Sequence, residues 1–434
     1  MSKNYILPKL YKDILNNLIP KFGSYDCLNK LILSNELHSN ELDISLSGGL
    51  SSLCIFFAEL NSIYPNKNYD KIAHNYLSMI IKYIEKNINN INISLWGGLC
   101  GIALATACMS NNFSRYQNLL KKINDLIIST IKEKLKLIEA LPLSKEEYYD
   151  VMYGLSGVAS YHMLFLNSTN MVDNLKLIIK YFISLCKDTI INNKKFPGLT
   201  LDMSKSSFIQ NKQKKYYINL GLSHGIPGIL LILVKSYKIG INLDGQLEAI
   251  KYLKNIIINY CYNKNKRIYW PTVVTFCLDS NNSESRYYTR DAWCYGTPGV
   301  AYVLLKTSEV LEDSSLKSLA TNAMLDSLKY KEFCISPTFC HGYAGLLYLA
   351  YKFSKLTKIE QFKIYQQELE RKILSFYNSQ NIFAFKDIDI VNGKSEHKDN
   401  IGLLSGTIGI ILSLLAVHGC KQTSWDTAFL LDDY

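Results

Sequence analysis

A glycine-centred turn that recurs seven times is the feature that most constrains how this chain can fold. Each copy precedes an uncharged apolar run, and the first glycine of the turn falls at positions 49, 98, 154, 225, 296, 342 and 406 of the 434 residues. In the first copy, Ser52 stands where the second glycine would be. Such self-similarity is typical of a repeat architecture, in which each unit buries an apolar face against its neighbours.

The stretches between the turns are amphipathic. In 114–137, one helical face carries Leu120, Ile123, Ile127 and Ile131. Comparable patterns occupy 171–186, 245–260, 314–329 and 357–376. Each repeat therefore pairs an apolar inner helix with an amphipathic outer helix, which predicts an all-α fold: a seven-fold α/α toroid, or double-layer helical barrel. An open superhelical solenoid is the alternative, although its terminal repeats would be capped and polar.

Two longer intervals between turns suggest an addition to this barrel. The segments 188–218 and 262–290 read as short strands and turns, punctuated by Pro197 and Pro271. We predict a single α/α barrel domain over 1–434, with these insertions forming a small appended β-containing module. The turn glycines are expected to let backbones crowd together and to leave helix N–H groups free for a ligand.

Composition places the chain among globular proteins. Hydrophobic residues make up 48% of the sequence, and the N-terminus has no apolar signal region. Eleven cysteines without compact disulfide spacing predict reduced, mostly buried thiols in a cytoplasmic protein. The uncharged segment 401–420 is long enough to span a bilayer, but its repeated Gly and Ser residues favour a buried helix.

The formal net charge of +11 admits an acidic peptide, an anionic membrane surface or nucleic acid as a partner. Basic residues alternate with acidic ones along the expected helices and do not cluster. No DNA- or RNA-binding signature occurs, so we expect no nucleic-acid partner.

Aligning the seven turn glycines brings chemically active residues into register. Cys294 and Cys340 lie two places before their glycine, and His224 and His341 lie one place before theirs. Asp150 and Arg290 lie four and six places before. All of them should therefore sit at the same end of the barrel.

Two cysteines and a histidine are a metal-ligand set. Cys294, Cys340 and His341 would leave the fourth tetrahedral position of a zinc ion open, as catalytic zinc sites require. Ordinary buried thiols and a core histidine are the alternative. His224 has no cysteine beside it and suits general acid/base work, with Asp150 orienting it and Arg290 stabilising negative charge.

The ordered motifs resemble those of the lanthionine synthetase C family, the LanC-type cyclases of lantibiotic biosynthesis. They are G-L-S-H-G at 221–225, R-D-A-W-C-Y-G at 290–296, C-H-G at 340–342 and Y-D-V-M-Y-G-L-S-G at 149–157. The resemblance implies a toroid with a smaller appended domain and one zinc ion on the ligands named above. It also implies that His224, Asp150, Arg290, Trp293 and Tyr295 line the active site.

The resemblance implies a reaction and partners as well. Cysteine thiols of a precursor peptide would add to dehydrated Ser and Thr residues of that peptide and close thioether rings. The expected partners are this precursor, with its leader and core, a dehydratase and an export transporter; through them the protein would lie at the inner face of the membrane. One alternative is a LanC-like protein that joins glutathione to dehydrated residues or is a non-catalytic scaffold. The other is a zinc prenyltransferase, which would need a Lys- and Arg-lined diphosphate pocket that the turns do not indicate.

Overall fold

The computed structural model describes residues 7–35, 43–141, 144–205, 215–264, 267–277, 284–287 and 289–433. The chain falls into two compact units. Unit 1 comprises 1–123, 334–354 and 360–425, and unit 2 comprises 124–333, 355–359 and 426–434. Unit 1 therefore takes its repeats from both ends of the chain.

Seven apolar helices begin directly after the first glycine of each turn, as the repeat predicts. Their side chains are almost all buried, and each fully buried Leu or Ile stabilises the fold by about 1.5–3 kcal/mol. These inner helices are α3 (Leu50–Ile63), α5 (Leu99–Met109), α8 (Leu155–His162), α10 (Ile226–Lys238), α12 (Thr297–Leu311), α14 (Tyr343–Thr357) and α16 (Thr407–Val417). In unit 1 the last of them, α16, packs against the first, α3.

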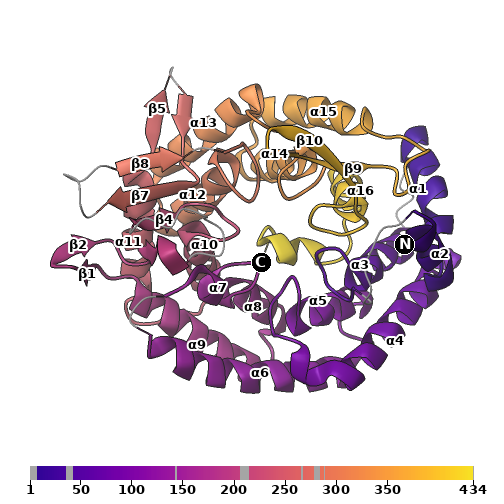
Figure 1. Ribbon diagram of the computed structural model, residues 1–434, viewed down its shortest axis with the longest axis horizontal. Coiled ribbons are helices and arrows are strands. Elements are labelled where there is room, and N and C mark those ends of the chain that lie inside the picture. The colour runs from indigo at the N-terminus through magenta and orange to yellow at the C-terminus, as the bar shows by residue number, and fades with distance from the viewer. Residues whose placement is uncertain are drawn as a thin grey trace. The chain divides into compact units, whose positions relative to one another are not determined.

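Amphipathic helices follow the inner ones in sequence. They are α4 (Tyr69–Asn87), α6 (Gln117–Glu139), α9 (Thr169–Leu185), α11 (Gln246–Asn259), α13 (Ser314–Tyr330) and α15 (Gln361–Leu374). In the pairs α3/α4, α10/α11 and α12/α13, the amphipathic helix lies along its inner partner (Figure 1). Leu120, Ile123, Ile127 and Ile131 of α6 are all buried, so the predicted apolar face is confirmed.

The remaining helices complete the two units. The α-helices are α1 (Lys9–Phe22), α2 (Tyr25–Ser34) and α7 (Glu146–Tyr149), and the single 3-10 turns are Pro65–Lys67, Ile88–Asn90, Met163–Phe165, Met203–Lys205 and Trp425–Phe429. Helix α1 is tied to α15 by a hydrogen bond of 2.6 Å from the Tyr11 hydroxyl to Glu370.

Both predicted insertions contain strands, and strands from both join one sheet of unit 2. The antiparallel order is β3 (Leu201–Asp202), β4 (Lys215–Asn219), β7 (Val273–Cys277) and β8 (Glu284–Tyr287). Figure 1 shows β4, β7 and β8 side by side. Two small hairpins accompany this sheet, β1 (Thr189–Ile191) with β2 (Lys194–Phe196) and β5 (Tyr262–Lys264) with β6 (Arg267–Tyr269). Within the insertions, 206–214, 265–266, 278–283 and 288 lie outside the described residues.

A hairpin in unit 1 was not predicted. Strands β9 (Lys386–Val391) and β10 (Lys394–Asp399) pair in antiparallel register around Asn392 and Gly393. Both turn residues have positive φ, 51° and 75°, which is the conformation of a two-residue hairpin turn. An Asn-Gly pair between alternating residues is a strong hairpin signal, so the sequence did contain the evidence.

The turn glycines do allow close backbone approach. A Cβ on Gly98 would lie 2.1 Å from the carbonyl oxygen of Asn92, and that same oxygen accepts the N–H of Leu99 at 2.9 Å. Equivalent N–H bonds run from Leu50 to Asp43, from Tyr343 to Ser336 and from Thr407 to Asn400. The expectation that the glycines leave these N–H groups free for a ligand is therefore wrong at these four turns.

The predicted fold class is confirmed: the described part of the chain is mainly helical, with only small sheets. Among the described residues, no helix is both long and apolar enough to cross a membrane. In the uncharged segment 401–420, the helix α16 is only 11 residues long.

Candidate active site

Backbone hydrogen bonds join successive glycine turns within unit 2. The N–H of Val151 donates to the Ser223 carbonyl at 2.9 Å, and the N–H of Ser223 donates to the Cys294 carbonyl at 3.2 Å. The register argument is thus confirmed for this unit, because the turns that carry Asp150, His224 and Cys294 are direct neighbours.

Asp150 and His224 form a pair in which the carboxylate is buried and the imidazole is partly exposed. His224 Nδ1 lies 2.6 Å from Asp150 Oδ2, and because a carboxylate only accepts, the imidazole donates through Nδ1. The other carboxylate oxygen accepts the N–H groups of Tyr153 and Gly154, both at 2.7 Å. Asp150 therefore caps the start of α8 and orients His224 at the same time.

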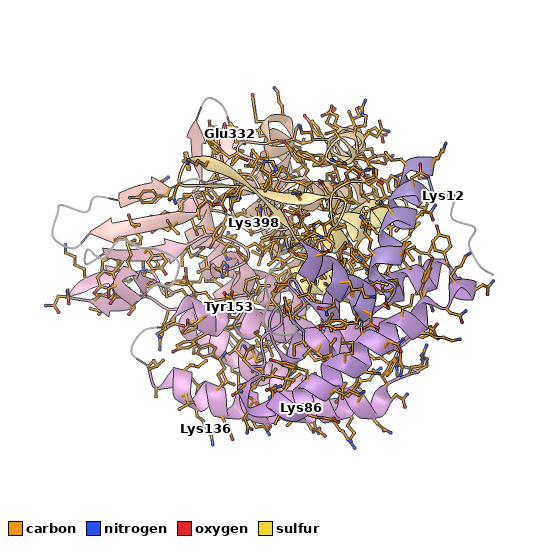
Figure 2. All side chains as sticks on the ribbon, turned by 45° about the vertical axis from the view of Figure 1, so that its right-hand side comes forward. Lys12, Lys86, Lys136, Tyr153, Glu332 and Lys398 are labelled. Carbon is orange, nitrogen blue, oxygen red and sulfur yellow. The ribbon has the colours of Figure 1, made fainter. Side chains whose placement is uncertain are left out.

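Two aromatic rings flank the His224 imidazole. The Tyr153 ring lies 6.3 Å from it at an interplanar angle of 24°, and the Tyr295 ring lies 6.0 Å away at 30°. Tyr153 is 49% exposed, and Figure 2 labels it. A Cβ on Gly221 would lie 2.3 Å from the Tyr295 ring, so the glycine makes room for this tyrosine. Tyr153, which precedes its turn glycine as His224 does, was missed as a site residue.

A buried carboxylate supports the turn that carries His224. Glu146 of α7 accepts a hydrogen bond from Asn219 Nδ2 at 2.7 Å, and Asn219 Oδ1 accepts the N–H of Gly221 at 2.9 Å. Burial raises the pKa of Glu146. Glu146 and Asp150 lie one helical turn apart, so both secure the turn at 219–225 from the same side. Neither Glu146 nor Asn219 was predicted from the sequence.

Arg290 occupies a turn position that other repeats fill with a capping residue. Six residues before the glycine, four turns have a side-chain oxygen that accepts the N–H two residues on, at 2.7 to 2.9 Å: Asp43, Asn92, Asn219 and Asn400. Arginine has no acceptor, and its turn instead uses Gly296 at φ 82°. The turn thus places a half-buried guanidinium where a structural cap would otherwise be.

Buried contacts hold the rest of the 290–296 motif in place. Trp293 is fully buried, and its indole N–H donates to the carbonyl of Phe429 in the C-terminal segment at 3.1 Å. Buried Arg267 pairs with Asp291 at 2.5 Å and with Glu332 at 2.8 Å. These contacts hold the loop in which Cys294 lies, whereas Trp293 itself is covered by protein.

The corresponding part of unit 1 contains Cys340 and His341, which are both partly exposed. The N–H of Cys340 donates to the Leu404 carbonyl at 2.9 Å, which repeats the turn-to-turn bonding of unit 2. His341 Nε2 lies 2.8 Å from Asp387 Oδ1 on β9. Hydrogen bonds from His341 and from two hydroxyl groups lower the pKa of Asp387 against the effect of burial. Sequence reasoning missed Asp387 together with its hairpin.

The predicted metal ligands are divided between the units, with Cys294 on unit 2 and Cys340 and His341 on unit 1. Among the described residues, no three His, Cys, Asp or Glu side chains form a cluster that could hold a metal ion. Elsewhere, burial raises the pKa of Cys108 and Cys186 to about 12, which makes them poor ligands and nucleophiles. The assignment of all three ligands stays a prediction.

Comparison with known proteins identifies the family. A family model described as lanthionine synthetase C-like protein matches residues 40–430. The chain belongs to this lanthionine synthetase C-like family. The family predicted from the four motifs is therefore confirmed, and with it the prediction of an enzyme of the lanthionine synthetase type.

Two relatives of this lanthionine synthetase C-like chain cover nearly all of it. Nisin biosynthesis protein NisC of Lactococcus lactis subsp. lactis is 28% identical over 398 residues, 90% of either chain. The solved structure of a nisin cyclase superimposes with a TM-score of 0.78 at 24% identity, covering 97% of this chain and 98% of that one. The two proteins share a fold.

Proposed function

We propose that this protein is a zinc-dependent cyclase that closes lanthionine and methyllanthionine rings in a lantibiotic precursor. In this reaction a peptide cysteine thiol adds to a dehydroalanine or dehydrobutyrine of the same peptide. The observation that carries the proposal is the His224–Asp150 pair, because such a reaction needs a proton donor at a fixed place and the pair provides one.

The proposed zinc ligands are Cys294, Cys340 and His341. Two thiols and one imidazole are a soft donor set that suits zinc, and the carboxylate of Asp387 on His341 is the outer partner that zinc-binding histidines usually have. Bound zinc would lower the pKa of a substrate thiol, so that thiolate, the nucleophilic form, is available near neutral pH.

The remaining chemistry belongs to the residues of unit 2. As the thiolate sulfur bonds to the β-carbon, the carbon–carbon double bond opens and negative charge moves onto the enolate oxygen. The Arg290 guanidinium suits that charge. His224, whose Nδ1 is fixed by Asp150, would take up at Nε2, at the far side of the ring, the proton that the substrate thiol releases. The resulting imidazolium would return that proton to the α-carbon.

The substrate of such an enzyme is the dehydrated precursor peptide, with a dehydratase and an export transporter as partners. We place the protein in the cytoplasm, at the inner face of the membrane when it is bound to these partners. The insertions at 188–218 and 262–290 would form an extension that engages the leader. The net charge of +11 and the strands in both insertions suggest this role. Deleting either insertion should weaken leader binding in calorimetry, and unchanged affinity in a folded variant would reject this role.

Incubation of the purified, zinc-loaded protein with a dehydrated precursor tests the activity. Alkylation and mass spectrometry count the free thiols, and fragmentation reports which residues are joined. We expect thiols to disappear faster than in the enzyme-free control, with defined ring connectivity. Equal rates with and without protein would reject the cyclase, and thiol loss only when glutathione is added would indicate a conjugating enzyme.

A further inference from the structure

We propose that Asp387, on the β9–β10 hairpin, is a positioning residue that fixes which nitrogen of His341 faces the metal. This inference rests on the proposed function, because it concerns the residues that would hold zinc. It assigns the unpredicted hairpin a part in the site.

One oxygen of Asp387 collects three hydrogen bonds. His341 Nε2 approaches Oδ1 to 2.8 Å, Ser336 Oγ donates to the same oxygen at 2.8 Å and Thr338 Oγ1 at 3.3 Å. Both hydroxyl residues are fully buried, so these donors hold the carboxylate in one orientation. All three donors come from the turn at 336–342, which also contains Cys340.

The hairpin is fastened to this turn by its backbone. The N–H of Ile388 donates to Ser336 Oγ at 3.2 Å. Asp387 is paired in register with Lys398 of β10, which Figure 2 labels, and the next pair, Lys386 with Asp399, forms an ion pair of 3.1 Å. The strand therefore delivers the carboxylate to His341 at a defined position.

The consequence for His341 is a fixed tautomer. A carboxylate accepts only, so the proton of the neutral imidazole lies on Nε2 and the lone pair on Nδ1. Nδ1 is then the nitrogen that can bind zinc without giving up a proton. Hydrogen bonding to a carboxylate also makes the ligand more basic, and loss of such an outer partner typically costs about 10–100-fold in metal affinity.

Zinc binding to full-length Asp387→Asn protein tests this role. The dissociation constant is measured by competition with a chromophoric chelator, using zinc ions alone and no peptide. We expect it to rise about 10–100-fold, while circular dichroism stays as in the wild type. Asp399→Asn is the matched control, since it breaks the neighbouring ion pair of the same hairpin and leaves the bonds of Asp387 in place; its affinity should change less than threefold.

The absorption spectrum of the cobalt(II)-loaded proteins gives a second readout that a merely structural role would not move. Asp387→Asn should shift the d–d bands, and Asp399→Asn should not. Equal zinc affinity and equal spectra for wild type and Asp387→Asn would overturn the positioning role but leave the zinc enzyme intact. A wild-type protein that binds no zinc would overturn both proposals.

Discussion

The turn of unit 2 at 219–225 and the turn of unit 1 at 336–342 each present a histidine one place before the turn glycine, yet they prepare it differently. His224 is anchored through Nδ1 by Asp150, which is itself fixed by two backbone N–H groups. His341 is anchored through Nε2 by Asp387, which is fixed by two hydroxyl groups. The repeat therefore determines where each histidine lies along its turn. The hydrogen bond to the carboxylate determines which nitrogen of the ring remains for other interactions.

The neighbour two places before the glycine strengthens the contrast. Cys340 precedes His341, whereas Ser223 precedes His224 and gives its hydroxyl hydrogen to the Cys294 carbonyl at 3.3 Å. A thiol beside one imidazole would supply two metal ligands from one turn, and a serine beside the other would leave that imidazole for proton transfer. We therefore propose metal binding at the 336–342 turn and acid/base work at the 219–225 turn.

The largest effect is expected from removing a thiol. Cys340→Ala and Cys294→Ala should each lose the bound zinc, about one ion per chain, together with the ring-forming activity, because two remaining ligands rarely retain a metal. Cys334→Ala, at a buried thiol near the same turn as Cys340, is the control and should keep both. Circular dichroism should remain strongly helical in all three. Zinc content at the wild-type level in both ligand variants would break the assignment.

Asp150→Asn should have the next largest effect. The asparagine side chain has only one oxygen that can accept hydrogen bonds. If that oxygen accepts from the N–H groups of the α8 cap, the amide NH₂ faces His224 Nδ1 and cannot accept its proton. We expect the cyclisation rate to fall by roughly 10²-fold, the low end for a positioned acid or base, with zinc content unchanged. Glu147→Gln, at a half-exposed carboxylate of α7, the helix that ends just before Asp150, serves as the control. A rate within threefold of the wild type would show that Asp150 is only a cap.

A smaller effect is expected at Tyr153. Replacing it with Ala removes the ring stacked on His224, an interaction of about 0.5–1.5 kcal/mol, so kcat/KM should fall about 2- to 12-fold. Tyr153→Phe keeps the ring and should retain most of the rate. If the two variants lose activity equally, the hydroxyl and not the stacking is what matters.

The smallest effect on the rate is expected at Glu59, a buried carboxyl group that makes the stability of the fold depend on pH. Glu59 of α3 accepts the N–H and hydroxyl of Thr423 at 2.9 and 2.7 Å, and burial raises its pKa to about 7. The folded state thus holds a proton that the unfolded state releases above its ordinary pKa of 4.5. This contribution to stability is full below about pH 4.5 and is lost as pH rises through about 7, up to about 3 kcal/mol in total.

Glu59→Gln should flatten the dependence of Tm on pH over this range and leave the rate per folded molecule unchanged. Parallel Tm curves for the two proteins would contradict the assignment.

The sequence predicted the helices and site residues that occupy equivalent positions in the repeats. It missed the contacts between a turn and a segment that lies outside the repeat pattern. Glycine spacing located the seven inner helices and placed His224 beside Asp150, because equivalent turn positions become neighbours in space. Asp387 lies 46 residues beyond His341, and no regular spacing connects them. The Asn392–Gly393 hairpin signal indicated the strands but not the turn they would contact.

Burial also divides the predicted residues in a way that spacing could not. Trp293 and Tyr295 belong to the same motif, yet the indole lies fully buried against the C-terminal segment, whereas Tyr295 is partly exposed beside His224. Glu146 and Asn219 support the His224 turn from positions whose role appears only in three dimensions. Whether a motif residue contacts substrate or supports its neighbour depends on packing that the motif alone does not encode.

The most direct test of the contrast between the two turns measures zinc content and cyclisation rate on the same preparations of His224→Asn and His341→Ala. With a dehydrated precursor as substrate and the uncatalysed reaction subtracted, His224→Asn should keep its zinc and lose roughly 10²–10⁴-fold in rate. His341→Ala should lose zinc and activity together. Loss of zinc in His224→Asn, or an undiminished rate in that variant, would contradict the division of labour between the two histidines.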